Sequence, residues 1–135
     1  MLGYQSLSSD LATLILRVTI GGLFVYHGYT KVIAFNEILP QFPDIIGIGA
    51  KLSFILVIFA EFVCGFLVAV GFLTRLAVIP VFITMIVAYF IAHGKDAFNV
   101  KELAFVFLVL FVAIFVAGSG KYSIDYLIQK NKRNV

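Results

Sequence analysis

The stretch KLSFILVIFAEFVCGFLVAVGFL, residues 51–73, decides the fold, because it is apolar and long enough to cross a bilayer. Between Lys51 and Arg75 it holds a single acid, Glu61, and no base. A carboxylate at the centre of a membrane helix costs about 2.5–3.5 kcal/mol on insertion scales. Such a residue usually faces the interior of a helix bundle and finds a partner there. The stretch therefore predicts a membrane protein with a buried polar centre at Glu61.

The composition of the whole chain agrees with this prediction. Hydrophobic residues make up 62% of the 135 residues and charged residues 13%, whereas soluble domains carry about 25% charged residues. A domain of this size has too much surface to hide the excess apolar residues from water. The net charge is +3, and the bases are scattered except in the tail that holds Lys130, Lys132 and Arg133. We therefore predict the lipid bilayer as a partner, with the tail contacting anionic lipid, and no nucleic acid.

Several function classes are excluded by what the sequence lacks. The single cysteine, Cys64, excludes an internal disulfide and a C-x-x-C redox pair. No nucleophile elbow, zinc motif or phosphate loop is found, so a self-contained hydrolase or transferase has no support, and we predict no metal site. The N-terminus has no basic region and no A-x-A site, so no signal peptide is predicted.

Four apolar runs predict four transmembrane helices, at about residues 11–32, 52–73, 76–92 and 103–120. The fourth run is short if it ends at Ala117, so we expect it to continue through residues 118–120. Only two residues separate the second and third runs, which predicts a tight helical hairpin. The segment 33–50 contains two prolines and is expected to lie on the membrane surface. We predict an all-α, four-transmembrane-helix bundle that forms one domain over residues 1–135.

The distribution of Lys and Arg predicts the orientation. An even number of spans places both termini on one side, together with Arg75, Lys121 and the basic tail. The bases on the other side, Lys31, Lys51, Lys95 and Lys101, are accompanied by acids. We therefore expect both termini of this multi-pass protein to be cytoplasmic.

The rise of 1.5 Å per residue gives each polar residue a depth below the inner surface. Arg17 falls at about 9 Å and Glu61 at about 18 Å, while Tyr89 and His27 fall at about 20 and 24 Å. His93 falls at about 25 Å, level with His27. These five residues are the predicted polar centre, as candidates for binding a ligand or carrying a proton.

Glycines indicate how the first two spans pack. Gly21 and Gly28 recur on the stripe of span one that carries Arg17, and Gly65 lies on the matching stripe of span two. Small residues let two membrane helices approach closely. We therefore expect spans one and two to pack together, with Glu61 facing Arg17 or His27.

Each candidate also has a purely structural interpretation. Glu61 and Arg17 can form an ion pair that only fixes helix register. His27 and His93 can bond to neighbouring backbone or carboxylate groups; they could also ligate a haem iron, but nothing else marks a haem pocket. Cys64 is most simply a small apolar residue on a helix face.

Three strings in this order resemble the DoxX family of small membrane proteins. They are LRVTIGGLFVYHGYTK in span one, AEFVCGFLVAVGFLTR over span two and the hairpin, and GSGKYSID after span four. The family pattern is matched by Arg17, His27, Gly28, Lys31, Glu61, Gly71, Arg75, Ser123 and Asp125. The resemblance covers roughly residues 11–128.

The resemblance implies a four-helix bundle in the cytoplasmic membrane and an association with quinone-linked redox complexes or thiol-handling partners. It also implies that Arg75 and Asp125 lie at the cytoplasmic surface. If the GSGKYSID segment turns back toward the hairpin, Asp125 can pair with Arg75 or Arg17; otherwise both are simply solvated.

Two functions of different class follow. In the first, the chain is a membrane subunit linked to redox chemistry that binds quinone or lipid at the polar centre, with other membrane or redox subunits or a second copy as partners. In the second, it is a non-catalytic anchor or assembly subunit, and the polar centre only specifies packing. A small transporter has less support, because no repeat or broken helix is visible. Whether the chain is an enzyme stays open; at most it is a subunit of an oxidoreductase complex.

Overall fold

The computed structural model describes residues 8–134, and all regular structure within them is helical. The expectation about a signal peptide falls partly on residues 1–7, which lie outside the described residues. The elements are α1 (Ser9–Ile33), α2 (Phe35–Ile38), η1 (Leu39–Gln41), α3 (Ala50–Ile58), η2 (Phe59–Cys64), α4 (Gly65–Val70), α5 (Thr74–Ile86), η3 (Val87–Ala92), α6 (Phe98–Ala117) and α7 (Ile124–Arg133). The segments η2 and η3 are π-helical turns, and each continues the α-helix before it without a break.

Four continuous helices are long and apolar enough to cross a membrane, as the sequence predicted. They run over Ser9–Ile33, Ala50–Val70, Thr74–Ala92 and Phe98–Ala117. The predicted fourth span was wrong at both ends, because the helix begins at Phe98 and ends at Ala117. Gly118 stops it, since its φ of 77° and ψ of −158° are not helical.

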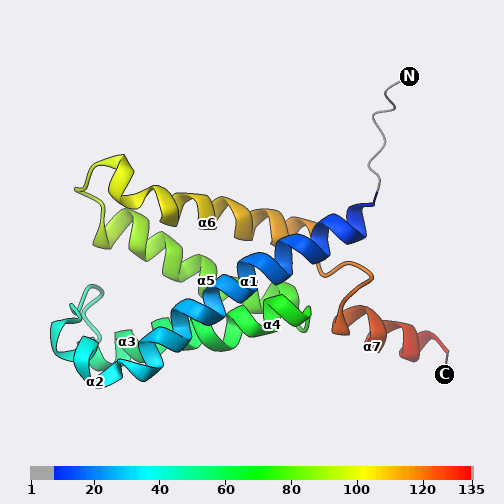
Figure 1. The fold of residues 1–135 in the computed structure, drawn as a ribbon, viewed down its shortest axis with the longest axis horizontal. Helices are drawn as coiled ribbons and strands as arrows, with labels where there is room; N and C mark the ends of the chain where they lie inside the picture. The colour runs from blue at the N-terminus through cyan, green and yellow to red at the C-terminus, as the bar shows by residue number, and fades with distance from the viewer. Residues whose placement is uncertain (1–7, 135) are drawn as a thin grey trace.

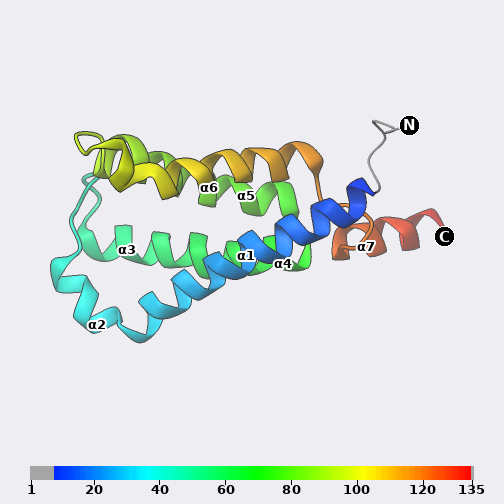
Figure 2. The same cartoon turned by 45° about the horizontal axis from the view of Figure 1, so that its top comes forward.

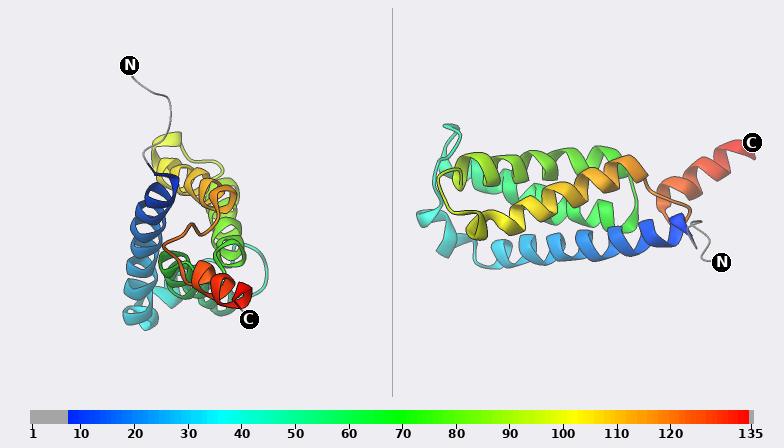
Figure 3. Two further views of the ribbon diagram at one scale, coloured as in Figure 1. Left: turned by 90° about the vertical axis from the view of Figure 1, so that its right-hand side faces the viewer. Right: turned by 90° about the horizontal axis from the view of Figure 1, so that it is seen from above.

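The four spans run alternately up and down around one core (Figure 1). Seen along the bundle in the left panel of Figure 3, each span packs against the two beside it. The contacts close the ring in the order α1, α3–α4, α5–η3 and α6. The centre is filled by apolar side chains from all four spans, among them Phe24, Val68, Val81 and Phe111, each at most 2% exposed.

Glycines set the close approach of α1 to the second span, as predicted. A Cβ atom on Gly21 would lie 2.7 Å from the backbone nitrogen of Ala69, and one on Gly28 would lie 2.5 Å from that of Phe62. Both distances are too short for real side chains. The two backbones therefore touch over this face, and the prediction that spans one and two pack together is confirmed.

The hairpin between α4 and α5 is a short turn with two left-handed residues. Gly71 ends α4 at φ 73°, and its N–H bonds to the carbonyls of Leu67 and Val68. Phe72 N–H also bonds to Leu67 O at 2.9 Å, which completes a Schellman-type ending. Leu73 has a φ of 48°, which is uncommon for a residue with a Cβ and needs support from its surroundings.

Opposite ends of the bundle differ in their connections (Figure 2). At the end far from the termini, α2 and η1 fold back so that the rings of Phe35 and Phe42 pack on Phe54, with centroids 5.2 and 4.8 Å away. At the other end, α7 follows a loop from α6 and extends beyond the four spans (Figures 1 and 2).

Candidate functional site: a polar cavity at Glu61

Glu61 forms its ion pair with Lys31. The Lys31 Nζ atom lies 2.6 Å from Glu61 Oε2, and the glutamate side chain is 9% exposed. The expected contact with Arg17 was therefore wrong. Lys31 is in the last turn of α1, and its long flexible side chain reaches from there to the middle of the second span.

Beside this pair lies a cavity of about 230 Å³ to which all four spans contribute. His27 and Phe24 come from α1, Glu61 from η2, and Met85 and Ala88 from the third span. His93, which follows η3, and five residues of α6 complete the lining; the five are Val100, Lys101, Leu103, Ala104 and Phe107. The structure thus brings together His27, Glu61 and His93, three of the five residues predicted for the polar centre.

Two of the elements that line the cavity are π-helical. Glu61 lies inside η2, and Ala88 lies inside η3. A π-helical turn inserts one extra residue into an α-helix and leaves part of the hydrogen-bond ladder irregular, and such turns frequently occur at functional sites. Their presence on neighbouring spans marks this level of the bundle as specialised.

The two histidines differ in their environment. His93 Nδ1 lies 2.7 Å from the Asp96 carboxylate, and both side chains are close to half exposed at the far end of the bundle. His27 is half-buried, and its ring lies edge-on to Phe24 and Phe107. No hydrogen bond to the His27 ring is found in residues 8–134, and the residue lines the cavity beside Glu61.

Tyr89 and Arg17, the other two predicted members, lie away from the cavity lining. The Tyr89 ring is covered by Lys101, whose Nζ is 4.6 Å from the ring centroid, and it packs on Phe90 and Phe105. Lys101 also lines the cavity, so Tyr89 touches the site only through that lysine.

Arg17 is fully buried at the end of the bundle that carries the termini. Its guanidinium donates hydrogen bonds to the carbonyls of Val68, Ala69 and Tyr122 at 3.2, 3.0 and 2.7 Å. The first two carbonyls belong to the last turn of α4, where the helix itself offers too few N–H groups to bond to every carbonyl. Arg17 thus joins α1 to the end of α4 and to the loop before α7.

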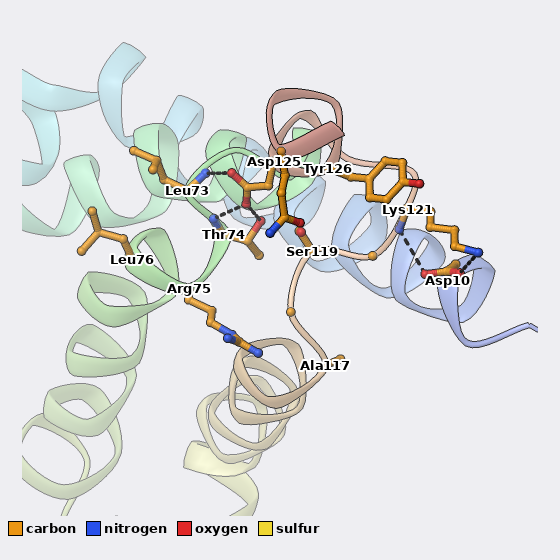
Figure 4. A pocket seen from close by; sticks show the side chains of 13 residues that line it. Asp10, Leu73, Thr74, Arg75, Leu76, Ala117, Ser119, Lys121, Asp125 and Tyr126 are labelled. Carbon is orange, nitrogen blue, oxygen red and sulfur yellow. Dashed lines mark hydrogen bonds and ion pairs between the residues drawn. The ribbon is translucent and has the colours of Figure 1, made fainter. Parts of the chain in front are cut away.

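Asp125 supports the strained hairpin from the same end (Figure 4). Its carboxylate accepts hydrogen bonds from the N–H groups of Leu73 and Thr74, at 2.8 and 3.1 Å, and from the Thr74 hydroxyl at 3.0 Å. Asp125 N–H in turn donates to Gly71 O at 2.9 Å. The GSGKYSID segment therefore does turn back to the hairpin.

The predicted ion pair between Arg75 and Asp125 was wrong. No salt bridge involves either residue within the described chain, because the Asp125 carboxylate is taken up by the first turn of α5. Arg75 instead donates from Nε to Phe115 O at 3.1 Å. We call Arg17, Asp125 and Thr74, with the backbone groups they bind, the hairpin clamp.

Sequence reasoning missed the roles of Lys31 and Lys101. Lys31 was counted as a loop base and placed on the stripe of span one that carries Arg17, but it was not predicted as the partner of Glu61, although it falls four residues after His27 and therefore on the same helix face. That spacing was the available signal. No spacing in the sequence indicated the role of Lys101, because the turn between η3 and α6 is what brings this residue to the cavity.

The lining contains no group of three or more His, Cys, Asp or Glu residues able to hold a metal, and none occurs elsewhere in residues 8–134. Cys64 is buried and unpaired. The ionisable groups in the cavity lining are one carboxylate, one amine and two imidazoles, and the carboxylate is paired with the amine of Lys31. Such groups can donate and accept hydrogen bonds and hold protons.

Comparison with known proteins places the chain in a family. The DoxX family model matches residues 12–94. The chain is 32% identical over 127 residues to the Escherichia coli protein named "Inner membrane protein YqjF", with 90% of this chain and 95% of that protein covered. It is 30% identical over 129 residues to the Bacillus subtilis protein named "Putative oxidoreductase CatD", with 94% of each covered.

An uncharacterized protein of Haemophilus influenzae is 29% identical over 134 residues, covering 93% of this chain and 89% of that protein. No solved structure matches the chain significantly. The family match extends over the first three spans, while the similarity to the relatives covers at least 90% of this chain. The chain is a multi-pass membrane protein that belongs to the DoxX family.

Proposed function

We propose that this protein is a cytoplasmic-membrane subunit of quinone- or thiol-linked redox chemistry, and that it binds a quinone or lipid headgroup in the Glu61 cavity. One observation carries the proposal: a buried carboxylate, paired with a lysine, lines a cavity that also receives two histidines and a second lysine. Ionisable groups inside a membrane are costly and mark ligand sites and proton pathways.

The size of the cavity supports a headgroup rather than a whole ligand. Its volume of about 230 Å³ is below the range of roughly 300–1,000 Å³ that is usual for complete small-molecule sites. Val100 and Leu103 on its rim are 57% and 59% exposed. A ring can therefore enter the cavity while its hydrocarbon tail stays in the lipid.

The residues suggest how a quinone would be held. Lys101, which lines the cavity, can donate a hydrogen bond to a carbonyl oxygen, and His27 can donate or accept. Glu61 holds the Lys31 side chain in place, and the His93–Asp96 pair lies where protons can arrive from the water at the far end. In this proposal a partner protein supplies the electrons, and the single cysteine, Cys64, is not a redox centre.

The names of two relatives support the proposed membrane location and the proposed link to redox chemistry. One is named "Inner membrane protein YqjF" and another "Putative oxidoreductase CatD". Together with the four apolar spans they favour the cytoplasmic membrane for this chain. We further propose that both termini face the cytoplasm, in agreement with the excess of bases at that end.

Native mass spectrometry tests the proposal. The protein is extracted from its own host in mild detergent, as wild type, as Glu61→Gln and as Glu102→Gln. The expected result is a bound quinone or a co-purifying oxidoreductase subunit in the wild type. Glu61→Gln should lose the quinone, whereas Glu102→Gln should keep it, because Glu102 is exposed and does not line the cavity.

Two results would contradict the proposal. If the wild type carries only phospholipid and Glu61→Gln changes nothing, the cavity is not a redox site. If Glu61→Gln abolishes assembly with a partner but no quinone is found, the second function, a non-catalytic assembly subunit, replaces the first.

A further inference from the structure

A second, larger pocket lies at the opposite end of the bundle, where the termini are. It measures about 680 Å³ and lies between the start of α5, the end of α6 and the loop before α7 (Figure 4). Its charged lining residues are Asp10, Arg75, Lys121 and Asp125. The Glu61 cavity shares no lining residue with it, so the two are separate sites.

The two acids of this pocket are already occupied. Asp10 accepts a hydrogen bond from Lys121 N–H at 3.1 Å and lies 3.8 Å from the Lys121 Nζ atom. Asp125 is held by the first turn of α5. Arg75, in contrast, is exposed and has no carboxylate partner in residues 8–134. Its only hydrogen bond there is from Nε to Phe115 O. The N–H groups on its two terminal nitrogens stay available to an anion.

An apolar groove continues from Arg75 along the same two helices. It measures about 270 Å³ and is lined only by apolar side chains, Val78, Ile79 and Phe82 of α5 and Phe111, Val112 and Phe115 of α6. Its floor is buried, with Phe111 at 0% and Val78 at 2%, while Ile79, Val112 and Phe115 on its rim are each close to half exposed.

The pocket and the groove form one amphiphilic surface. Residues 75, 78, 79 and 82 follow helical spacing, so Arg75 stands on the face of α5 that lines the groove. Its hydrogen bond to Phe115 O fixes the guanidinium over the groove end. In Figure 4 the Arg75 side chain reaches from α5 toward the C-terminal end of α6. A cation therefore lies at the membrane boundary directly above a strip of apolar side chains.

We propose that this surface binds one anionic phospholipid, with its phosphate on Arg75 and one acyl chain in the α5–α6 groove. Arginine is suited to phosphate because its planar N–H groups match two phosphate oxygens. The groove has no polar group that would be left unpaired under a hydrocarbon chain. The position of Arg75 in the first turn of α5, at the end of a span, is the level at which lipid phosphates lie.

Charge decides between this occupant and a second copy of the chain. A second copy would have to present an acid to Arg75, and the acids at this end, Asp10 and Asp125, are both engaged within the chain. An anionic lipid supplies the missing negative charge and an apolar tail together.

The test uses the full chain in nanodiscs that contain either phosphatidylglycerol or phosphatidylcholine, followed by native mass spectrometry. The wild type is expected to retain one phosphatidylglycerol and to retain phosphatidylcholine about tenfold less, because the choline cation lies next to the phosphate and is repelled by Arg75. Arg75→Gln should lower the retained phosphatidylglycerol about tenfold. Lys51→Gln removes a positive charge at the far end of the bundle, outside the pocket and the groove, and should change nothing.

A groove variant keeps the test independent of Arg75. Val112→Trp fills the exposed rim of the groove and should also displace the lipid, with Arg75 intact. The proposal is overturned if both lipids are retained equally, if Arg75→Gln or Val112→Trp retains phosphatidylglycerol like the wild type, or if the groove proves to be covered by a second copy. These outcomes leave the Glu61 proposal untouched, because its quinone readout concerns a different cavity.

Discussion

The hairpin clamp and the Glu61 cavity both place charges inside an apolar bundle, but they use them differently. In the clamp, Arg17 and Asp125 bind mainly backbone groups of the α4–α5 hairpin and the loop before α7. Backbone groups are fixed, so these bonds hold helices and leave little for a ligand. In the cavity, Glu61 and Lys31 bind each other beside empty space.

The difference teaches which buried charges point to function. Burial of a charge does not by itself indicate function, since Arg17 is more deeply buried than Glu61. The informative combination is a side-chain pair, free imidazole nitrogens and an adjoining cavity. We therefore assign stability to the clamp and ligand binding to the cavity, and four substitutions separate these roles.

Arg17→Met should have the largest effect on stability. It removes three hydrogen bonds from a charged donor, and such bonds contribute about 1.5–3 kcal/mol each when buried. We expect a loss of at least about 3 kcal/mol in the free energy of unfolding, measured by denaturant titration in detergent. Arg17→Lys keeps the positive charge but lacks the planar guanidinium, so it should recover only part of the lost stability. An unchanged unfolding curve for Arg17→Met would show that the hairpin clamp does not stabilise the fold.

Gly28→Ala should have the next largest effect, because it acts on the contact that holds α1 against η2. The added methyl would collide with the Phe62 backbone, and such overpacking costs about 1–3 kcal/mol. Gly22→Ala on the same helix is the matched control, since a Cβ there meets nothing within 4 Å. Equal thermal midpoints for the two variants would show that the close approach does not matter.

Asp125→Ala tests capping against ion pairing. It removes the acceptor for two N–H groups at the start of α5, and the loss of a cap costs about 0.5–2 kcal/mol. Arg75→Gln should change stability by less than about 0.5 kcal/mol, as an exposed substitution does. Equal destabilisation by the two variants, together with rescue by the charge-swapped double variant, would instead indicate the ion pair.

Tyr89→Phe should have the smallest effect. The ring that packs under Lys101 is kept, and the hydroxyl has no hydrogen bond among the described residues, so we expect a change below about 0.5 kcal/mol. Quinone retention should also stay at the wild-type level. A clear loss of bound quinone in this variant would extend the site beyond the cavity lining.

Much of this architecture could be predicted from the sequence. The spans follow from long apolar runs, and the packing of the first two follows from Gly21, Gly28 and Gly65, because both signals depend only on local spacing. The partner of Glu61 could not be predicted, because depth arithmetic treats helices as upright and side chains as short. In the structure α1 runs obliquely across the second span (Figure 1), and the Lys31 side chain reaches inward.

The role of Asp125 could not be predicted from the sequence either. An acid and a base near the same surface suggest an ion pair, but the hairpin exposes unpaired N–H groups at Leu73 and Thr74 that bind the carboxylate first. Their presence depends on the left-handed turn at Gly71 and Leu73, which is visible only in three dimensions.

The most direct test of the central contrast measures unfolding and quinone retention on the same preparations of wild type, Glu61→Gln and Arg17→Met. We expect Glu61→Gln to unfold close to the wild-type midpoint without bound quinone, because Lys31, freed from the pair, lies in the last turn of α1 and can turn to the interface. We expect the folded fraction of Arg17→Met to keep its quinone but to unfold much earlier. If Glu61→Gln unfolds like Arg17→Met and its folded fraction still holds quinone, the Glu61–Lys31 pair is a structural element and the division of roles is wrong.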